Sequence, residues 1–592
     1  MKKDSITPDS YYYSRLEILG KRSLKEKKRL KNLSLLRLTV FLITAFLMYW
    51  FYTGFLSLIY MGFPGLAVFL FLVSKYTDLK SENIKTGKLI EINSLELEIL
   101  KGKFNQLPEG LEYNDPEHEF CKDIDLFGKG SFFQYLNRTS LNEGESGLAD
   151  FLKQNKIHGI SQKQEALKEL AAMADWRQEF MAKAALVQTE ITTNKLVRWI
   201  ENYQHFMPVK AKLFSLVFSS VSTLLILGVF FGLVYENYLI LWFFTGLGIT
   251  GLYFKRVNQL SEQTSRLKNT FDQYSQIMYL LESKKFNAAY INNRLAPVQE
   301  GDLKCSYLLK KFSMALDALD QRNNMLFGVL ANGFFLWDMF QARRIEKWLA
   351  LYDKEVKRWF DLISFFDTHN ALANFVFNHP DYTFPKINHQ NKTKAVDAAH
   401  PLIATKKVVK NTFEIENRDF LVITGANMAG KSTFLRTVSL LIVMANSGLP
   451  VCATSFDYHP FKLITSMRTS DSLTDDESYF FSELKRLKFI VEVIEKDQYF
   501  VILDEILKGT NSIDKASGSK KFIEKLVRLQ TTGIVATHDL SLCELEEKIE
   551  QVKTYYFDAE IIDDELYFDY TLKKGVCTNM NASFLLKKMK IV

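Results

Sequence analysis

Cysteine is scarce in this sequence, and the cysteines it has form no motif. Five occur among 592 residues, far apart at Cys121, Cys305, Cys452, Cys543 and Cys577. Disulfide frameworks are typical of short secreted chains, and structural zinc sites need closely spaced thiolates. The spacing therefore argues against both and favours a reducing, cytosolic environment. The length predicts roughly three or four structural units, because one hydrophobic core rarely serves so long a chain.

Charge is absent from a long stretch near the N-terminus. Between Leu38 and Val73 there is no Asp, Glu, Lys or Arg. This stretch is too long for one membrane span and suits two spans of about 17–18 residues. Turn-forming residues place the reversal either near Thr53-Gly54 or at Gly62-Phe63-Pro64.

A second pair of uncharged runs follows later in the chain, at Leu213–Val234 and Tyr238–Phe254. A soluble core helix rarely continues this far without a charge on its outer face. We therefore predict two transmembrane hairpins, at 38–76 and 213–254, which would place four transmembrane helices in a lipid bilayer. Buried core helices are the alternative interpretation.

The charges that flank these runs predict their orientation. From Ser14 to Arg37 there are nine Lys or Arg against two Glu, and the turns between the spans carry only Glu236. The second hairpin is bracketed by Lys210, Lys212, Lys255 and Arg256. The positive-inside rule then predicts a multi-pass protein of the cell (inner) membrane with both termini in the cytoplasm. The basic tail, 1–37, could also contact anionic lipid or nucleic acid, but topology alone accounts for its charge.

One further apolar run, Met325–Phe340, is a weaker candidate for a span. It is short and contains Asn332 and Asp338. An odd number of spans would also place the C-terminal region on the other side of the membrane. We expect a buried helix here.

The rest of the chain divides into helical and mixed parts. Residues 77–212 and 255–385 show helical spacing of apolar positions, and the second of these regions is poor in Gly and Pro. Turn formers gather at 379–393, which predicts a linker. From there to residue 592, short β-branched runs alternate with helical patterns, which predicts a mostly parallel sheet in an α/β domain at 386–592.

The α/β region contains a glycine-rich loop, in the segment LVITGANMAGKSTFLRT at 421–437. The loop fits G-x-x-x-x-G-K-[ST] between a strand-like run and a helix, which is the context of a phosphate-binding P-loop. Lys431 is placed to reach the β- and γ-phosphates of ATP, and Ser432 to bind Mg²⁺. The residues expected to bind ATP are Gly425, Ala426, Asn427, Met428, Ala429, Gly430, Lys431, Ser432 and Thr433.

Two later strand ends supply further chemistry. The apolar run Tyr499–Leu503 ends in Asp504 and Glu505, and the run Gly533–Thr537 ends in His538. Asp504 suits a direct or outer-sphere Mg²⁺ ligand, and Glu505 is placed to polarise an attacking water. His538 could position or sense the γ-phosphate. Glu505, His538 and Lys431 are therefore the expected catalytic residues of an ATPase.

This constellation resembles the ABC-type ATPases, and among them the MutS family. The resemblance rests on four motifs. They are TGANMAGKSTFLR at 424–436, Asp504-Glu505 with Gly509-Thr510 and Asp514, Ala536-Thr-His538, and GVCTNMN at 575–581. Ser478-Tyr-Phe-Phe-Ser-Glu483-Leu looks like the family's trans signature, which implies a homodimer in which Ser478, with Glu483, completes the partner's site. Asp475-Asp476-Glu477 departs from the family pattern and adds negative charge there.

The resemblance covers about 119–592, interrupted by the second hairpin, with the helices of 255–385 similar to the family's core and lever region. Family members that read mismatches begin with a domain that inserts a Phe-x-Glu motif into DNA. Only 118 residues precede Glu119 here, and many are apolar, which argues against mismatch recognition. DNA binding of another kind stays open.

The resulting fold class is a C-terminal α/β P-loop ATPase domain behind an all-α core and lever region with two transmembrane hairpins. The functional interpretation is a membrane-tethered, MutS-like ATPase related to DNA mismatch repair or recombination proteins. The alternatives are a membrane-anchored ABC-type motor and a nucleotide-switched scaffold for a protein partner. No ionisable residue lies inside a predicted span, which argues against a polar transport path.

Overall fold

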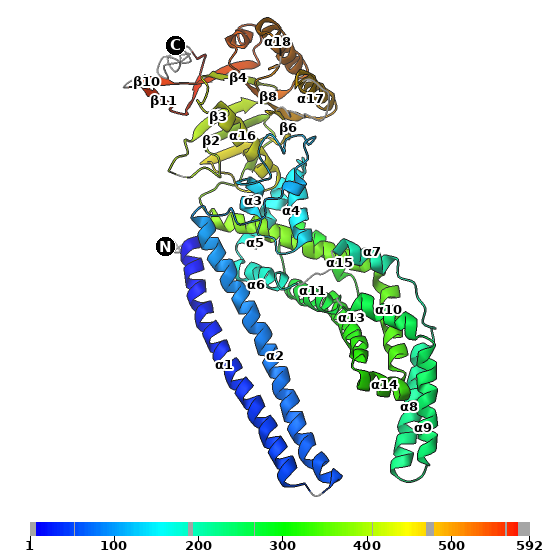
Figure 1. Ribbon diagram of the computed structural model, residues 1–592. Helices are drawn as coiled ribbons and strands as arrows, with labels where there is room; N and C mark the ends of the chain where they lie inside the picture. The colour runs from blue at the N-terminus through cyan, green and yellow to red at the C-terminus, as the bar shows by residue number, and fades with distance from the viewer. Residues whose placement is uncertain are drawn as a thin grey trace.

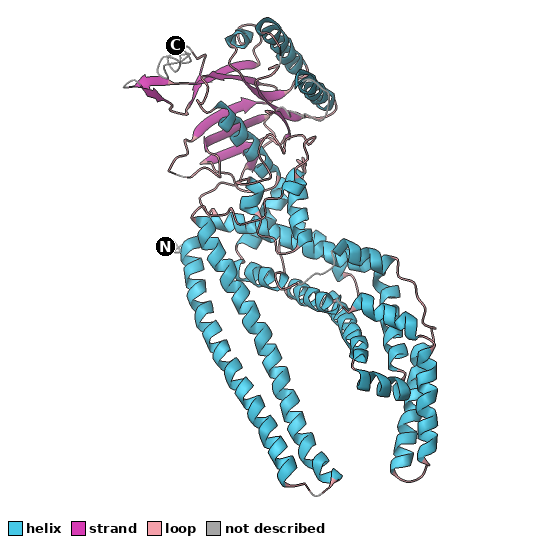
Figure 2. Cartoon of the chain, viewed as in Figure 1, coloured by secondary structure: helices cyan, strands magenta, loops and turns pink. Residues whose placement is uncertain are grey.

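The computed structural model describes residues 7–577 except 53, 188–192, 266, 405, 469–478, 509 and 563–564. The molecule is elongated, with the C-terminal domain at one end and two helical hairpins extending from the other (Figure 1). Among these described residues, strands occur only in the C-terminal domain, and the preceding part is helical (Figure 2). The predicted order of an all-α region followed by a mixed α/β domain is confirmed.

The first hairpin is formed by two of the longest helices, α1 (Pro8–Trp50) and α2 (Phe55–Leu100). The chain therefore reverses at the first of the two predicted turns, and Pro64 lies inside α2. The helices pack closely where Gly65 faces Thr44, because a Cβ on Gly65 would lie 2.2 Å from Thr44 Oγ1. Both helices extend well beyond their apolar segments toward the C-terminal domain (Figure 1).

The helical core surrounds α15 (Trp337–Asn378), a 42-residue helix that runs from the second hairpin to the C-terminal domain (Figure 1). At 1.5 Å per residue it is about 60 Å long. Its neighbours are η1 (Leu111–Tyr113), α3 (Phe132–Leu136), α4 (Asn142–Lys153), α5 (Ile160–Ala171), α6 (Ala174–Ala184), α7 (Thr193–Glu201), α10 (Phe254–Thr264), α11 (Leu267–Glu282), α12 (Ala289–Gln299), α13 (Cys305–Asp320) and η2 (Gln321–Asn323).

The second hairpin, α8 (Ala211–Phe230) and α9 (Glu236–Gly251), packs against a third apolar helix, α14 (Met325–Phe335). The prediction of a buried helix at Met325–Phe340 is wrong in two respects. The helix ends at Leu336, whose φ of 50° starts a bend of 85° into α15. Only one face is covered by the hairpin, so Met325 is 84% exposed and Leu326 73%.

Two described helices are long and apolar enough to cross a membrane, α1 and α8. The count rises to four if each bent pair, α9 with α10 and α14 with α15, is one span. Helix α2 is not among them. These are criteria of length and composition, so the four spans stay a prediction.

The C-terminal domain has two main sheets. The larger follows the order β12-β9-β4-β8-β7-β6, parallel except at β12, as the sequence predicted. The smaller, β1-β5-β2-β3, was not predicted. The strands are β1 (Lys386–Ile387), β2 (Lys392–Ala398), β3 (Asn411–Glu416), β4 (Phe420–Gly425), β5 (Ser455–Tyr458), β6 (Lys462–Ser466), β7 (Tyr499–Asp504), β8 (Thr532–Ala536), β9 (Val552–Phe557) and β12 (Leu572–Lys574), with a separate pair β10 (Glu560–Ile562) and β11 (Glu565–Tyr567).

The remaining elements of this domain are helices. They are α16 (Lys431–Asn446), α17 (Tyr479–Ile494), α18 (Ser512–Arg528) and η3 (Leu540–Leu545). The segment before α3 binds the domain directly. Thr465 N–H donates to Glu119 O at 2.9 Å, and Arg468 N–H donates to Asp123 Oδ1 at 2.9 Å. The helical core and the α/β domain therefore share a hydrogen-bonded junction.

A buried polar chain fastens the first hairpin to the end of α15. Tyr12 of α1 donates to Asn378 Oδ1 at 2.7 Å, and Asn378 Nδ2 donates to Glu96 of α2 at 2.8 Å. Glu96 is also paired with Arg138 at 2.6 Å, with both side chains almost fully buried. Because each member has partners, the chain holds the two helices in a fixed position on α15.

Replacement of Arg138 by Met should destabilise the protein strongly, because it leaves the carboxylate of Glu96 buried without its counter-ion. Losing one member of a buried pair costs about 3–5 kcal/mol. Lys101→Gln is the matched control, because the pair it forms with Glu98 is exposed to solvent and contributes little to stability. Thermal unfolding of the detergent-purified protein measures both. Equal melting temperatures for the two variants would contradict this role for Arg138.

Candidate functional site

The glycine-rich loop joins β4 to α16 at the carboxyl ends of the parallel strands of the larger sheet. Gly425 has a φ of +148°, and a Cβ there would lie 2.5 Å from Phe557 O. Gly430 has a φ of +105° and is the residue before α16 begins. Both positions therefore require glycine. The loop ends at a helix N-terminus, where unpaired N–H groups and the helix dipole favour an anion.

Lys431 folds back onto this loop. Its Nζ donates to Gly425 O at 2.8 Å and to Ala426 O at 2.9 Å, and it lies 3.3 Å from His538 Nε2. Burial lowers the pKa of the Lys431 ammonium below its ordinary value. The two carbonyl groups hold this partly desolvated cation beside the mouth of the loop.

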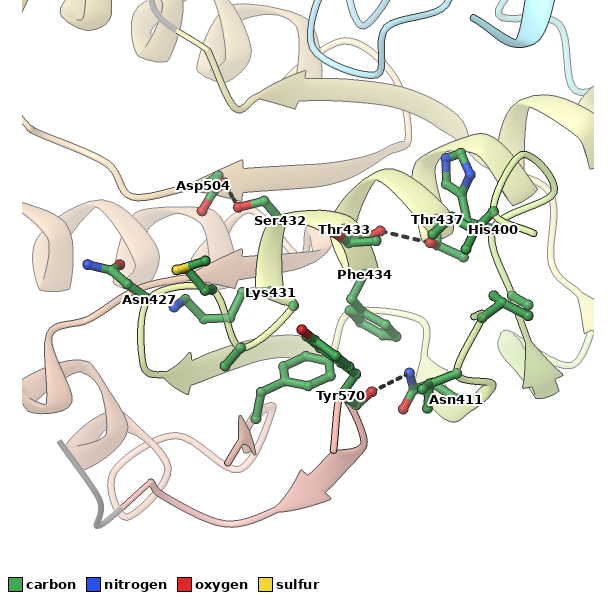
Figure 3. Close-up of a pocket in the computed structure, with 18 of the residues that line it drawn as sticks. His400, Asn411, Asn427, Lys431, Ser432, Thr433, Phe434, Thr437, Asp504 and Tyr570 are labelled. Atoms are coloured by element: carbon green, nitrogen blue, oxygen red, sulfur yellow. Dashed lines mark hydrogen bonds between the residues drawn. The ribbon is translucent and has the colours of Figure 1, made fainter. Parts of the chain in front are cut away.

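Ser432 and Asp504 meet across the site, as Figure 3 shows. Ser432, on the first turn of α16, donates from Oγ to Asp504 Oδ2 at 2.6 Å. Asp504 is the last residue of β7, which lies two strands from β4 in the sheet. The fold thus brings together a hydroxyl and a carboxylate that lie 72 residues apart in the sequence. Oxygens of these kinds are the ligands that Mg²⁺ prefers.

Glu505 and His538 form the next pair. His538 Nε2 donates to Glu505 Oε1 at 2.9 Å, and this hydrogen bond is the largest factor that lowers the pKa of Glu505 to about 2. Lys508 Nζ lies 3.8 Å from the other carboxylate oxygen. Glu505 is therefore ionised at neutral pH and can accept a proton or orient a water.

All these groups line one cavity of about 750 Å³. The cavity continues past the loop to residues that the sequence analysis missed, namely His400, Val408, Asn411, Phe434 and Tyr570. Figure 3 shows Asn411 and Tyr570 joined by a hydrogen bond, in which Asn411 Nδ2 donates to Tyr570 O at 3.0 Å. Burial lowers the pKa of His400 to about 4, so its ring is neutral at neutral pH. A signal existed, since His400 lies just after a strand-like run, as His538 does.

Of the predicted trans signature, Ser478 lies outside the described residues, as does Asp475-Asp476-Glu477. Glu483 is described and buried near the start of α17. Its carboxylate accepts Leu507 N–H at 2.6 Å and Lys508 N–H at 3.1 Å. Within its own chain, Glu483 thus holds the loop that follows Asp504 and Glu505. A contact of either residue with a partner subunit stays a prediction.

The fold and site define an α/β domain with a P-loop motif after β4 and an acidic pair at the end of β7. Residues 421–589 match the MutS domain V family. The chain is similar to the DNA mismatch repair protein MutS of Aquifex pyrophilus, at 33% identity over 32% of this chain and 23% of that protein. It is also similar to MutS protein homolog 4 of Homo sapiens, at 30% identity over 31% of this chain and 20% of that protein.

A longer match is to DNA mismatch repair protein MutS of Clostridium botulinum, at 31% identity over 42% of this chain and 26% of that protein. The chain thus spans only about a fifth to a quarter of the length of these curated relatives. The C-terminal domain is therefore similar to the corresponding part of MutS proteins.

Replacement of Glu483 by Ala should loosen the loop after β7, because the N–H groups of Leu507 and Lys508 lose a charged acceptor. Such a hydrogen bond is worth about 1.5–3 kcal/mol, or roughly a 10- to 150-fold faster amide exchange. Hydrogen exchange with mass spectrometry over residues 506–508 measures it. Glu492→Ala, on the exposed side of the same helix, is the control. Unchanged exchange in Glu483→Ala would refute this role.

Proposed function

We propose that the C-terminal domain binds ATP with Mg²⁺ and hydrolyses it. The observation that carries the proposal is the hydrogen bond of 2.6 Å between Ser432 and Asp504 at the N-terminus of α16, beside Glu505. A hydroxyl and a carboxylate facing each other at the end of a P-loop fit an Mg²⁺ ion. When bound, that ion would neutralise charge on the phosphates and orient them.

The residues of this chain then have separate roles. The loop N–H groups up to Ser432 hold the phosphates, and Lys431 exchanges its two carbonyl acceptors for phosphate oxygens. Glu505 orients the attacking water and accepts its proton, while His538 keeps Glu505 in place. His400, Phe434 and Tyr570 also line the cavity, where their rings suit the base and sugar of the nucleotide.

The similarity to MutS proteins supports two further parts of the proposal. The first is a homodimer in which Ser478 of one chain reaches the nucleotide of the other. The second is action on DNA, as the names of the similar proteins suggest. Branched or undamaged duplex DNA is the substrate that we propose.

We also propose that the two hairpins anchor the protein in the cell membrane, with the α/β domain in the cytoplasm. Both hairpin tips lie at the end of the molecule away from that domain (Figure 1). The most apolar stretch of α1 has no buried residue, and Leu224 and Phe230 of α8 are 69% and 81% exposed. Contiguous exposed apolar side chains of this kind mark surfaces that contact lipid or another protein.

One observation favours the alternative of a motor acting on a membrane or protein partner. Helix α15 is continuous from the second hairpin to the start of the C-terminal domain. His379, the residue after α15, is hydrogen-bonded to Tyr135 of α3 in the helical core. Movement in the α/β domain could therefore reach the hairpin without DNA. The response of ATP turnover to DNA separates this alternative from the proposal.

Replacement of Glu505 by Gln should lower ATP turnover about 100- to 10,000-fold while ATP still binds, because general-base catalysis is lost and the loop is intact. Lys431→Ala should abolish binding as well. Glu544→Gln removes the same charge from an exposed pair with Lys520 and should leave turnover unchanged. Phosphate release and equilibrium dialysis measure the two properties. Normal turnover in Glu505→Gln would refute the assigned catalytic role.

DNA should stimulate turnover of the detergent-purified protein, and the effect should fade as salt rises, because phosphate contacts release counter-ions. Homoduplex, mismatched and four-way-junction DNA are compared at two salt concentrations, with Lys431→Ala as the blank. A preference for the junction would identify a branched substrate. Turnover that no DNA changes would refute action on DNA and favour the motor.

A further inference from the structure

Helix α14 has an apolar surface that the protein only partly covers. Its inner face packs on α9, where a Cβ on Gly246 would lie 2.1 Å from Gly333 O. Its outer face leaves Met325, Leu326 and Leu330 exposed. With 11 residues the helix is about 16 Å long, half of a hydrocarbon core of about 30 Å. It is therefore too short to span a bilayer but fits within one leaflet.

Several backbone groups at the two ends of α14 have partners within the protein, which an apolar environment favours. At its start, Asn324 Oδ1 accepts Phe327 N–H at 3.2 Å, and Asn324 O accepts Gly328 N–H at 2.7 Å. At its end, Asn332 accepts twice. Its carbonyl accepts Leu336 N–H at 3.3 Å, and its side chain accepts Asp338 N–H at 2.9 Å. These bonds lower the cost of placing the helix in hydrocarbon, because the groups that they join need no water.

A groove of about 830 Å³ runs between α14, α8 and the start of α15. Its lining is Leu216, Ser219, Asn324, Leu326, Phe327, Leu330, Ala331, Phe334, Phe335, Trp337 and Phe340. The polar groups among them already have partners. Ser219 Oγ donates to Phe335 O at 3.2 Å, and Trp337 Nε1 donates to Ala318 O at 2.8 Å. The groove thus suits an apolar chain rather than a polar ligand.

One end of the groove is basic. Lys212 Nζ lies 5.8 Å from the centre of the Phe340 ring, which lines the groove. Arg343, one turn further along α15, donates to Val209 O at 3.4 Å and lies 3.9 Å from the buried carboxylate of Glu346, so the positive charge at this end is mainly that of Lys212. The other charges at the bend cancel, since Arg322 and Asp338 form a buried pair at 2.9 Å. An occupant with an apolar tail and an anionic head would therefore match both ends.

We propose that this groove binds an acyl chain of an anionic phospholipid from the bilayer, with the lipid phosphate beside Lys212 and α14 embedded in the same leaflet. The inference rests on the proposed membrane anchor. The groove is continuous with the uncharged face of α8, which the proposed anchor places in the membrane. Lipid is therefore favoured over a protein partner as the occupant. Leu216 belongs both to that face, at 48% exposure, and to the groove.

Photolabelling of the full-length protein in nanodiscs tests this site. Phosphatidylglycerol with a diazirine on its acyl chain is held at a fixed fraction, and adducts are mapped by mass spectrometry. We expect adducts at Leu216, Leu330 and Phe334 that fall about tenfold when the remaining phosphatidylcholine is replaced by unlabelled phosphatidylglycerol. Adducts at Leu224, on the outer face of α8, should change much less, because bulk lipid is not selected there.

Matched variants separate the groove from the surface around it. Leu330→Trp fills the groove and should abolish the competed adducts, whereas Val329→Trp, on the same helix but outside the lining, should keep them. Lys212→Gln should remove the preference for phosphatidylglycerol, whereas Lys210→Gln should not. Equal effects of the two Trp variants, or of the two Lys variants, would overturn the proposal.

The pattern of labels also separates this inference from the anchor. Labelling at Leu224 with none in the groove, or with equal competition at both, overturns the lipid site and leaves the anchor standing. Absence of labelling at both places overturns the anchor and the site with it. Cross-links between two copies through α14 would show that a second chain covers the groove, and would also overturn the proposal.

Discussion

The carboxylate of Asp367 lies buried in the C-terminal half of α15 and accepts the N–H groups of Ser140 and Leu141 just before α4. Burial raises its pKa to about 7, so its charge depends on these two donors. The fit leaves no spare room, because a Cβ on Gly144 would lie 2.1 Å from Asp367 Oδ2. Further along the same helix, Asn374 and Asn378 hold Arg177 and Tyr12. The arrangement of the helical core and the first hairpin depends on this polar face of α15.

The candidate site satisfies its own charges in the same way. Lys431 binds two loop carbonyls, Ser432 binds Asp504, and His538 binds Glu505. Each of these contacts uses the atom that a nucleotide, an ion or a water would need. A ligand must therefore replace existing hydrogen bonds, so the net gain in free energy is smaller than its own contacts would supply.

The predicted nucleotide chemistry depends on short motifs, and these motifs can be recognised in the sequence. The loop at 425–433 and the strand ends at Asp504 and His538 define their local geometry, because a parallel sheet brings such ends to one edge. The smaller sheet and the contribution of His400 were missed, since they depend on long-range pairing between short strands. The exposed face of α14 was also missed. An apolar run predicts that a helix is shielded from water, but its sequence does not distinguish shielding by protein from shielding by lipid.

The two hairpins leave the body at different places. One is fixed near the C-terminal end of α15 through Tyr12, and the other lies at its N-terminal end. If both hairpins enter one bilayer, the protein is anchored at two points, and α15 keeps these points apart. A second point of attachment restricts how far the body can tilt toward the membrane, while the whole protein still rotates about the membrane normal. Neighbouring copies would then meet as they diffuse in the plane with their α/β domains at a common height, so the search for a partner loses one translational dimension and much of the freedom to tilt.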